Sequence, residues 1–76
     1  MIGTVNAGHE IIAALPLVTG NDEYAVTAKR SDGQSSEYVT WLTTWSGNDF
    51  YWGHYFGAHK DGRALAIADM IKRAGY

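Results

Sequence analysis

Residues 36–56 have the sequence SEYVTWLTTWSGNDFYWGHYF, and this stretch decides the fold. Most positions in 36–45 and 50–56 carry a β-branched or aromatic side chain, and such side chains favour extended strands. The segment Ser46–Asp49 between them contains Gly and Asn and is typical of a tight turn. The stretch therefore predicts two antiparallel strands joined by a short connection.

A third strand is predicted immediately before this pair. In residues 22–30, apolar and polar side chains alternate, as they do in a strand with one buried face. The next segment, 31–35, contains Asp-Gly, which is a strong signal for a hairpin turn. We therefore expect a three-stranded antiparallel meander over residues 22–30, 36–45 and 50–56.

Residues 61–74 predict a C-terminal helix that packs on this sheet. Asp61 suits the N-cap position, and Gly75 suits the left-handed residue that follows a last helical turn. Apolar residues recur in this segment at helical spacing and are expected to form its buried stripe. The expected buried positions are Ala64, Ile67, Ala68, Ile71 and Ala74, and the expected exposed positions are Asp69, Lys72 and Arg73.

Residues 7–15 fit two structures. Asn6 is a suitable N-cap for a short helix, and Pro16 would end it because the residue before a proline avoids helical angles. The same residues are apolar enough to form a strand, and that alternative stays open. With the helix included, the expected fold class is α+β, a single domain over residues 1–76 in the order αβββα.

Composition and charge limit the function classes. The chain has 76 residues, of which 46% are hydrophobic, and eight acidic against six basic residues give a net charge of −2. It is too apolar for a disordered protein, and it lacks the excess of basic residues expected of a nucleic-acid binder. Absence of Cys excludes disulfides, and no apolar run reaches the roughly 18 residues of a membrane span. We therefore expect a cytoplasmic protein of the producing or host cell, with no membrane partner.

The predicted pairing of the last two strands assigns their side chains to two faces. If residues whose numbers sum to 95 lie opposite each other, Trp41, Trp52 and their neighbours form the more apolar face, which we expect under the helix. The other face then carries Tyr and Thr, and tyrosines offer large rigid contact areas with a polar end. The simpler interpretation is that Tyr and Thr only form good cross-strand pairs. The predicted partner-binding residues are Tyr38, Thr40, Thr44, Tyr51 and Tyr55.

The sequence contains no recognisable catalytic, metal-binding or phosphate-binding motif. His54, His59 and Asp61 have no spacing typical of zinc ligands, and the chain has no Cys nucleophile, nucleophile elbow or glycine-rich phosphate loop. We therefore expect no catalytic residues, no metal and no cofactor, and a protein that is not an enzyme.

Two resemblances bear on function. Tyr51-Trp52-Gly53-His54-Tyr55, followed by the Ala-rich helix from Ala64, resembles the strand-to-helix passage of AP2 and arm-type integrase DNA-binding domains, and with a first helix the order is also similar to double-stranded-RNA-binding domains. That resemblance implies a small nucleic-acid-binding domain. However, no Lys or Arg occurs from Ser31 to His59, where AP2-like domains place the basic residues that contact DNA.

The second resemblance covers roughly residues 22–76. Glu37–Trp41, then Phe50–Phe56, then an Ala-rich closing helix is similar to small accessory proteins of actinobacterial phages. It implies a compact protein that binds a host or phage protein and alters it. We therefore expect noncatalytic protein binding, self-association included, through the Tyr/Thr sheet face or a sheet edge, with nucleic-acid binding as the alternative.

Overall fold

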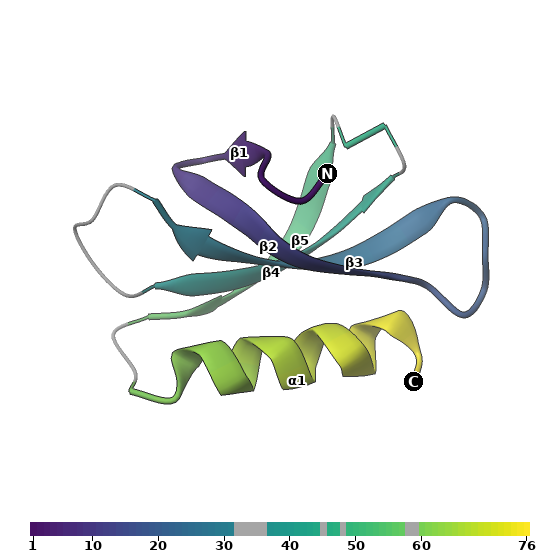
Figure 1. The fold of residues 1–76 in the computed structure, drawn as a ribbon. Coiled ribbons are helices and arrows are strands. Elements are labelled where there is room, and N and C mark those ends of the chain that lie inside the picture. Colours follow the sequence, from purple (N-terminus) through teal and green to yellow (C-terminus); the bar gives the residue numbers. More distant parts are fainter. Residues whose placement is uncertain (32–36, 45, 48, 58–59) are drawn as a thin grey trace.

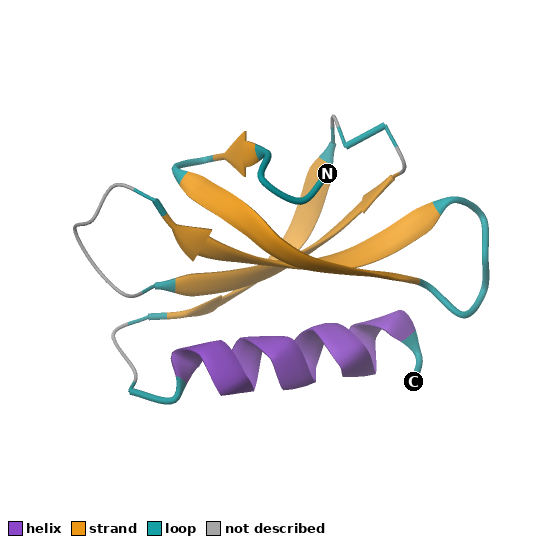
Figure 2. Cartoon of the chain, in the orientation of Figure 1, coloured by secondary structure: helices purple, strands orange, loops and turns teal. Residues whose placement is uncertain are grey.

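The computed structural model describes residues 1–31, 37–44, 46–47, 49–57 and 60–76. The described elements are β1 (Val5–Asn6), β2 (His9–Pro16), β3 (Glu23–Arg30), β4 (Tyr38–Thr44), β5 (Phe50–Phe56) and α1 (Gly62–Ala74). The strands form one antiparallel sheet in chain order, curved into an open half-barrel. Helix α1 runs along one face of the sheet, and β1 lies on the other side (Figures 1 and 2).

The predicted αβββα order is wrong at its beginning, because two strands replace the helix expected over residues 7–15. Ala7 and Gly8 both have positive φ angles, 48° and 73°, and join Asn6 to its cross-strand partner His9. Two positive φ values are the mark of a two-residue hairpin turn of the primed type. Alanine rarely adopts this conformation, so the sequence gives little indication of the turn.

The remaining elements lie close to their expected bounds. Strands predicted at 22–30, 36–45 and 50–56 are found at Glu23–Arg30, Tyr38–Thr44 and Phe50–Phe56, and the helix predicted at 61–74 is Gly62–Ala74. The predicted Asp-Gly turn and residues 36 and 45 lie outside the described residues. Gly75 ends the helix in the left-handed conformation, and its N–H donates to the carbonyl of Lys72.

The pairing of β4 with β5 differs from the prediction by one residue and then shifts again. Thr40 lies opposite His54, whereas Leu42 lies opposite Tyr51. Trp41 therefore faces two residues of β5, Trp52 and Gly53, which form a β-bulge. Because side chains alternate between faces, the one-residue difference exchanges the β5 residues that share each face of β4. His54 lies beside Thr40 on the face that α1 covers, and Tyr55 lies beside Val39 and Trp41 on the other face.

The helix also turns a different stripe toward the sheet. Its buried residues are Gly62, Ala66, Met70 and Ala74. Of the predicted buried positions, Ala74 is confirmed and Ile67 is half-buried against the core, whereas Ala64, Ala68 and Ile71 are exposed. Small residues at this stripe let the helix lie close to the sheet, where Met70 packs on Ala25. Thr27 also donates a hydrogen bond to the Met70 sulfur at 3.2 Å.

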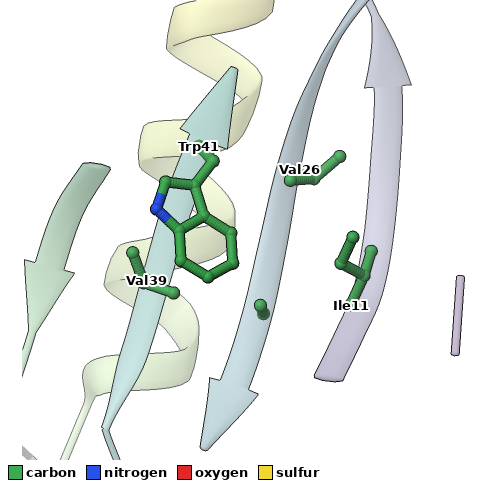
Figure 3. Close-up of a cluster of buried hydrophobic side chains, with 5 residues drawn as sticks. Ile11, Val26, Val39 and Trp41 are labelled. Carbon is green, nitrogen blue, oxygen red and sulfur yellow. The ribbon is translucent and has the colours of Figure 1, made fainter. Parts of the chain in front are cut away.

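The opposite face of the sheet has a core of its own. Ile11, Val26, Ala28, Val39 and Trp41 form a buried cluster on the side away from α1 (Figure 3). No helix covers this cluster in the described part of the chain. Rings surround Trp41 instead: His9 at 5.8 Å, Phe50 at 5.3 Å and Tyr55 at 6.5 Å between ring centroids.

Candidate functional site

The five residues predicted to bind a partner do not form one open face. Tyr38 and Thr40 are buried on the helix side of the sheet, and Thr44 and Tyr51 are half-buried there. Tyr55 is exposed and points to the opposite side, against Trp41. The predicted face assignment is wrong because α1 covers the Tyr/Thr side. Partner binding by Tyr55 or Tyr51 stays a prediction.

The most unusual exposed residue is Trp52, on the bulge of β5. Its side chain is 73% exposed, and its backbone φ is +55°. A left-handed conformation costs a bulky non-glycine residue of order 1 kcal/mol, so it persists only where surrounding contacts enforce it. A strained residue that also presents an indole to solvent is a candidate for function.

One of these contacts is the packing of Trp41 on Gly53, the second residue of the bulge. A Cβ atom at position 53 would lie 2.9 Å from Trp41 Nε1 and 2.9 Å from Tyr55 Cε1. Only glycine therefore leaves room for both rings. Trp41 occupies the space that a side chain at position 53 would need. The packing of the aromatic cluster therefore depends on a glycine in the bulge.

Arg73, on α1, holds the bulge from the other side. Its guanidinium donates to the Trp52 carbonyl at 2.5 Å, and to the Thr40 carbonyl at 3.1 Å and hydroxyl at 3.0 Å. Burial lowers the pKa of Arg73, and the nearby Asp69 carboxylate counteracts part of that effect. One cation thus ties β4, β5 and α1 together at the point where β5 is strained.

Asp69, one helical turn before Arg73, fixes the imidazole of His54. The carboxylate accepts hydrogen bonds from His54 Nδ1 at 2.9 Å and from the Thr40 hydroxyl at 2.5 Å. Burial works to raise the pKa of Asp69, but these two bonds and the charges of His54 and Arg73 outweigh it, so the pKa is lowered. His54 Nδ1 must carry the hydrogen, which leaves Nε2 directed away from Asp69.

Tyr51 anchors the beginning of the bulge. Its hydroxyl donates to Glu23 Oε2 at 2.9 Å, and its ring meets the Trp52 indole edge-on with centroids 5.6 Å apart. The hydrogen bond to Glu23, burial and the negative charges of Glu23 and Asp49 all raise the pKa of Tyr51. The phenol therefore stays neutral and continues to donate over the physiological pH range.

The hydrogen bonds around Asp69 and Arg73 connect helix α1 to the backbone and side chains of β4 and β5. A carboxylate that orients an imidazole is an arrangement found in general bases. Here, however, the hydroxyl that shares the network, Thr40, is fully buried and donates to Asp69. Among the described residues, no three His, Asp or Glu side chains gather as metal ligands. The network fixes the β5 backbone, and what reaches solvent is Trp52, His54 and Tyr55.

Sequence reasoning missed Trp52, Asp69 and Arg73 as site residues. One signal was present: a glycine inside a strand pattern indicates a bulge or a close approach, and Gly53 marks both. Asp69 and Arg73 are four residues apart and therefore share a helix face. They were expected in solvent only because the buried stripe of the helix was misassigned.

Comparison of the chain with protein-family models, with curated proteins and with solved structures found no significant match. Within the residues that the structure describes, no helix has the length and apolar character to cross a bilayer. The site must therefore be interpreted from its own geometry.

Proposed function

We propose that this protein is a noncatalytic binding module that holds a segment of a partner protein at the edge strand β5. The observation that carries the proposal is the conformation of Trp52, whose backbone is strained at φ +55° and whose side chain is 73% exposed. Arg73 holds the bulge in place through a hydrogen bond to the Trp52 carbonyl. The structure maintains this geometry at a cost in stability. An exposed, fixed indole is the kind of side chain that dominates protein interfaces.

The position of β5 supports this function. In the described sheet β5 is at the edge and pairs with β4 alone. An edge strand offers backbone N–H and C=O groups to an added strand, and side chains on both faces then contribute selectivity. His54 lies toward the helix side of this edge, Tyr55 lies on the other side, and the exposed Trp52 indole contacts the Tyr51 ring. We infer that an extended partner segment pairs with the regular end, His54–Phe56, and packs on Trp52.

The bulge also explains why such an edge is tolerated. A long, flat, apolar edge promotes aggregation, and bulges and polar residues are the usual protection. Here Trp52-Gly53 interrupts the regular backbone, and His54 places a polar ring between the aromatics. Only a short part of β5 is left for pairing, so selectivity would come from the side chains. The phage resemblance suggests that the partner is a host or phage protein.

The test is site-specific photo-crosslinking followed by a binding titration. A photoreactive phenylalanine analogue replaces Trp52 in one protein. In the matched control it replaces exposed Glu10 on β2, which two strands separate from β5 in the sheet order, and both proteins are mixed with an actinobacterial lysate. We expect a protein that crosslinks from position 52 and not from position 10. Purified, it should bind Trp52→Ala about 30-fold or more weakly than the unchanged chain, as for an interface hot spot.

Three results would contradict the proposal. The first is equal crosslinking from both positions, and the second is unchanged affinity of Trp52→Ala. The third is binding of single-stranded DNA that weakens steeply as salt rises, since that dependence indicates phosphate contacts and would support the nucleic-acid alternative.

A further inference from the structure

The outer surface of α1 carries an apolar hollow whose residue Ile67 also packs on the core between the helix and the sheet. It is lined by Ala64, Ile67, Ala68 and Ile71, with Lys60, Asp61 and Arg63 at the N-terminal end. Ile71 is 40% exposed, and Ala64 and Ala68 are also exposed. This surface is separate from β5, because Asp69 and Arg73 point from α1 toward β4 and β5.

The shape of this hollow suits a helix. Its apolar residues recur at spacings of three and four, so they form one stripe along α1 of about two turns, or roughly 10 Å. Ala64 and Ala68 have small exposed side chains, and the larger side chains of Ile67 and Ile71 also line the hollow. An amphipathic helix that packs its apolar face into such a stripe would insert its larger side chains over the alanines.

The charges at this surface select the partner. Lys60 and Arg63 border the hollow, and Lys72 is exposed on the same helix. Asp61 is the single acidic residue lining the hollow. The N-terminal end of a helix is itself partially positive. In a chain whose net charge is −2, this surface is locally basic, so it complements acidic side chains.

A second copy of this chain fits this surface poorly. If two copies met through their α1 stripes, both would bring the same basic residues, Lys60, Arg63 and Lys72, to the contact. Like charges brought together in this way oppose association. We propose that the outer stripe of α1 binds an amphipathic helix of another protein whose apolar face is flanked by Asp and Glu. The module would then have two contact surfaces, one on β5 and one on α1.

The test uses two synthetic peptides and the full chain. Each fluorescein-labelled peptide has about 14 residues, with Leu at i, i+3, i+4 and i+7, and the flanking positions are all Glu in one and all Lys in the other. We expect the Glu peptide to bind with a micromolar Kd in fluorescence anisotropy, and the Lys peptide to bind at least 10-fold more weakly. Ala68→Glu should weaken binding of the Glu peptide at least 10-fold, whereas Trp52→Ala should leave it unchanged.

Circular dichroism and thermal melting verify that Ala68→Glu is folded, as expected for a polar residue at an exposed helix position. If it is not folded, Ala64→Ser provides the milder variant, with an expected loss of two- to threefold. Equal affinity for both peptides, or an unchanged affinity in the folded variants, would overturn the proposal. So would a concentration-dependent dimer of the unchanged chain that Ala68→Glu dissociates in sedimentation. Binding to phosphatidylcholine–phosphatidylglycerol vesicles that requires Ala68 would overturn it in favour of a lipid surface.

Discussion

The two faces of the sheet are buried in different ways. The face toward α1 is covered by a helix with small residues at the contact, and hydroxyls of Thr27 and Thr40 bond to Met70 and Asp69 across it. On the opposite face, Met1, Ala14, Tyr24 and Phe50 pack on the buried cluster, and rings gather around Trp41. The helix side is held together by hydrogen bonds between the sheet and α1, and the opposite side by aromatic contacts between strands.

This difference shows how a 76-residue chain without disulfides buries both faces of one sheet. A single helix of 13 residues covers only one face. Curvature of the sheet and large rings complete the other, and each buried ring removes roughly 150–250 Å² from water. The Trp52-Gly53 bulge lies where both layers meet, with Trp41 on one side and Arg73 on the other.

The largest expected effect comes from Trp41→Ala. The indole is 4% exposed and in contact with His9, Phe50 and Tyr55, so its loss leaves a cavity at the centre of the aromatic layer. We expect the free energy of unfolding to fall by about 3–5 kcal/mol in urea denaturation. Met70→Ala, in the helix layer, should cost less. A larger loss for Met70→Ala would show that the helix layer dominates.

Gly53→Ala tests the contact between the layers. The added methyl group would lie 2.9 Å from atoms of two aromatic rings, so we expect a loss of about 1–3 kcal/mol from overpacking. Gly57→Ala is the matched control, because a Cβ atom there meets nothing within 4 Å. Equal thermal stability of the two variants would mean that Trp41 does not depend on Gly53 for its space.

Glu37→Ala should destabilise the end of the aromatic layer. His9 is 4% exposed, and its two ring nitrogens face the Ala7 carbonyl at 2.7 Å and Glu37 Oε2 at 2.9 Å. Removing the carboxylate leaves a buried nitrogen without its partner, which costs about 1–3 kcal/mol. Glu10→Ala, at an exposed position, should change the unfolding free energy by less than about 0.5 kcal/mol. Similar losses in both variants would argue against a specific role of the His9–Glu37 bond.

Much of the fold could be predicted because the relevant signals are local. Side-chain type predicted β5 at Phe50–Phe56, and the expected caps located α1 between Asp61 and Gly75. Gly75 has the predicted left-handed conformation, whereas the Asp61 side chain makes no capping hydrogen bond. The first hairpin was missed because Ala7, in its turn, has a positive φ angle, which alanine rarely adopts. Local signals therefore identify an element when its residues have strong preferences.

The candidate site could not be predicted in the same way. Its composition depends on a one-residue register difference between β4 and β5 and on the rotation of α1 about its axis, and both are set by packing. Of the predicted buried stripe, Ala74 is buried and Ile67 packs on the core, whereas Ala64, Ala68 and Ile71 lie on the outer surface of the helix. The preference for Met70 over Ile71 in the core depends on Thr27 and Ala25, which lie more than forty residues earlier.

Asp69→Asn should reduce stability in a pH-dependent way. The folded pKa of Asp69 is lowered despite its burial, because Thr40 and His54 donate to it and Arg73 is near. Its stabilising effect is therefore complete above the unfolded pKa, about 3.9, and is lost as pH falls through the lower folded pKa. We expect a loss of about 1 kcal/mol at pH 7 that shrinks below pH 4, measured by urea titrations. A loss that persists at pH 2 would exclude the ionised carboxylate as its cause.

The smallest expected change in stability, and the one most informative about function, comes from Trp52→Gly. Glycine adopts positive φ without strain, while the exposed indole makes an edge-on ring contact with Tyr51. Relief of the strain stabilises the fold by about 1 kcal/mol, but the greater freedom of glycine in the unfolded chain offsets part of this gain, so we expect the unfolding free energy to stay the same or rise by less than about 1 kcal/mol. The same variant should lose the partner that crosslinks from position 52. Such a result would mean that Trp52 is kept at the expense of stability, as residues at binding sites often are. If Trp52→Gly instead lowers stability by more than about 1 kcal/mol, the indole supports the fold, and the reason for assigning it to an interface disappears.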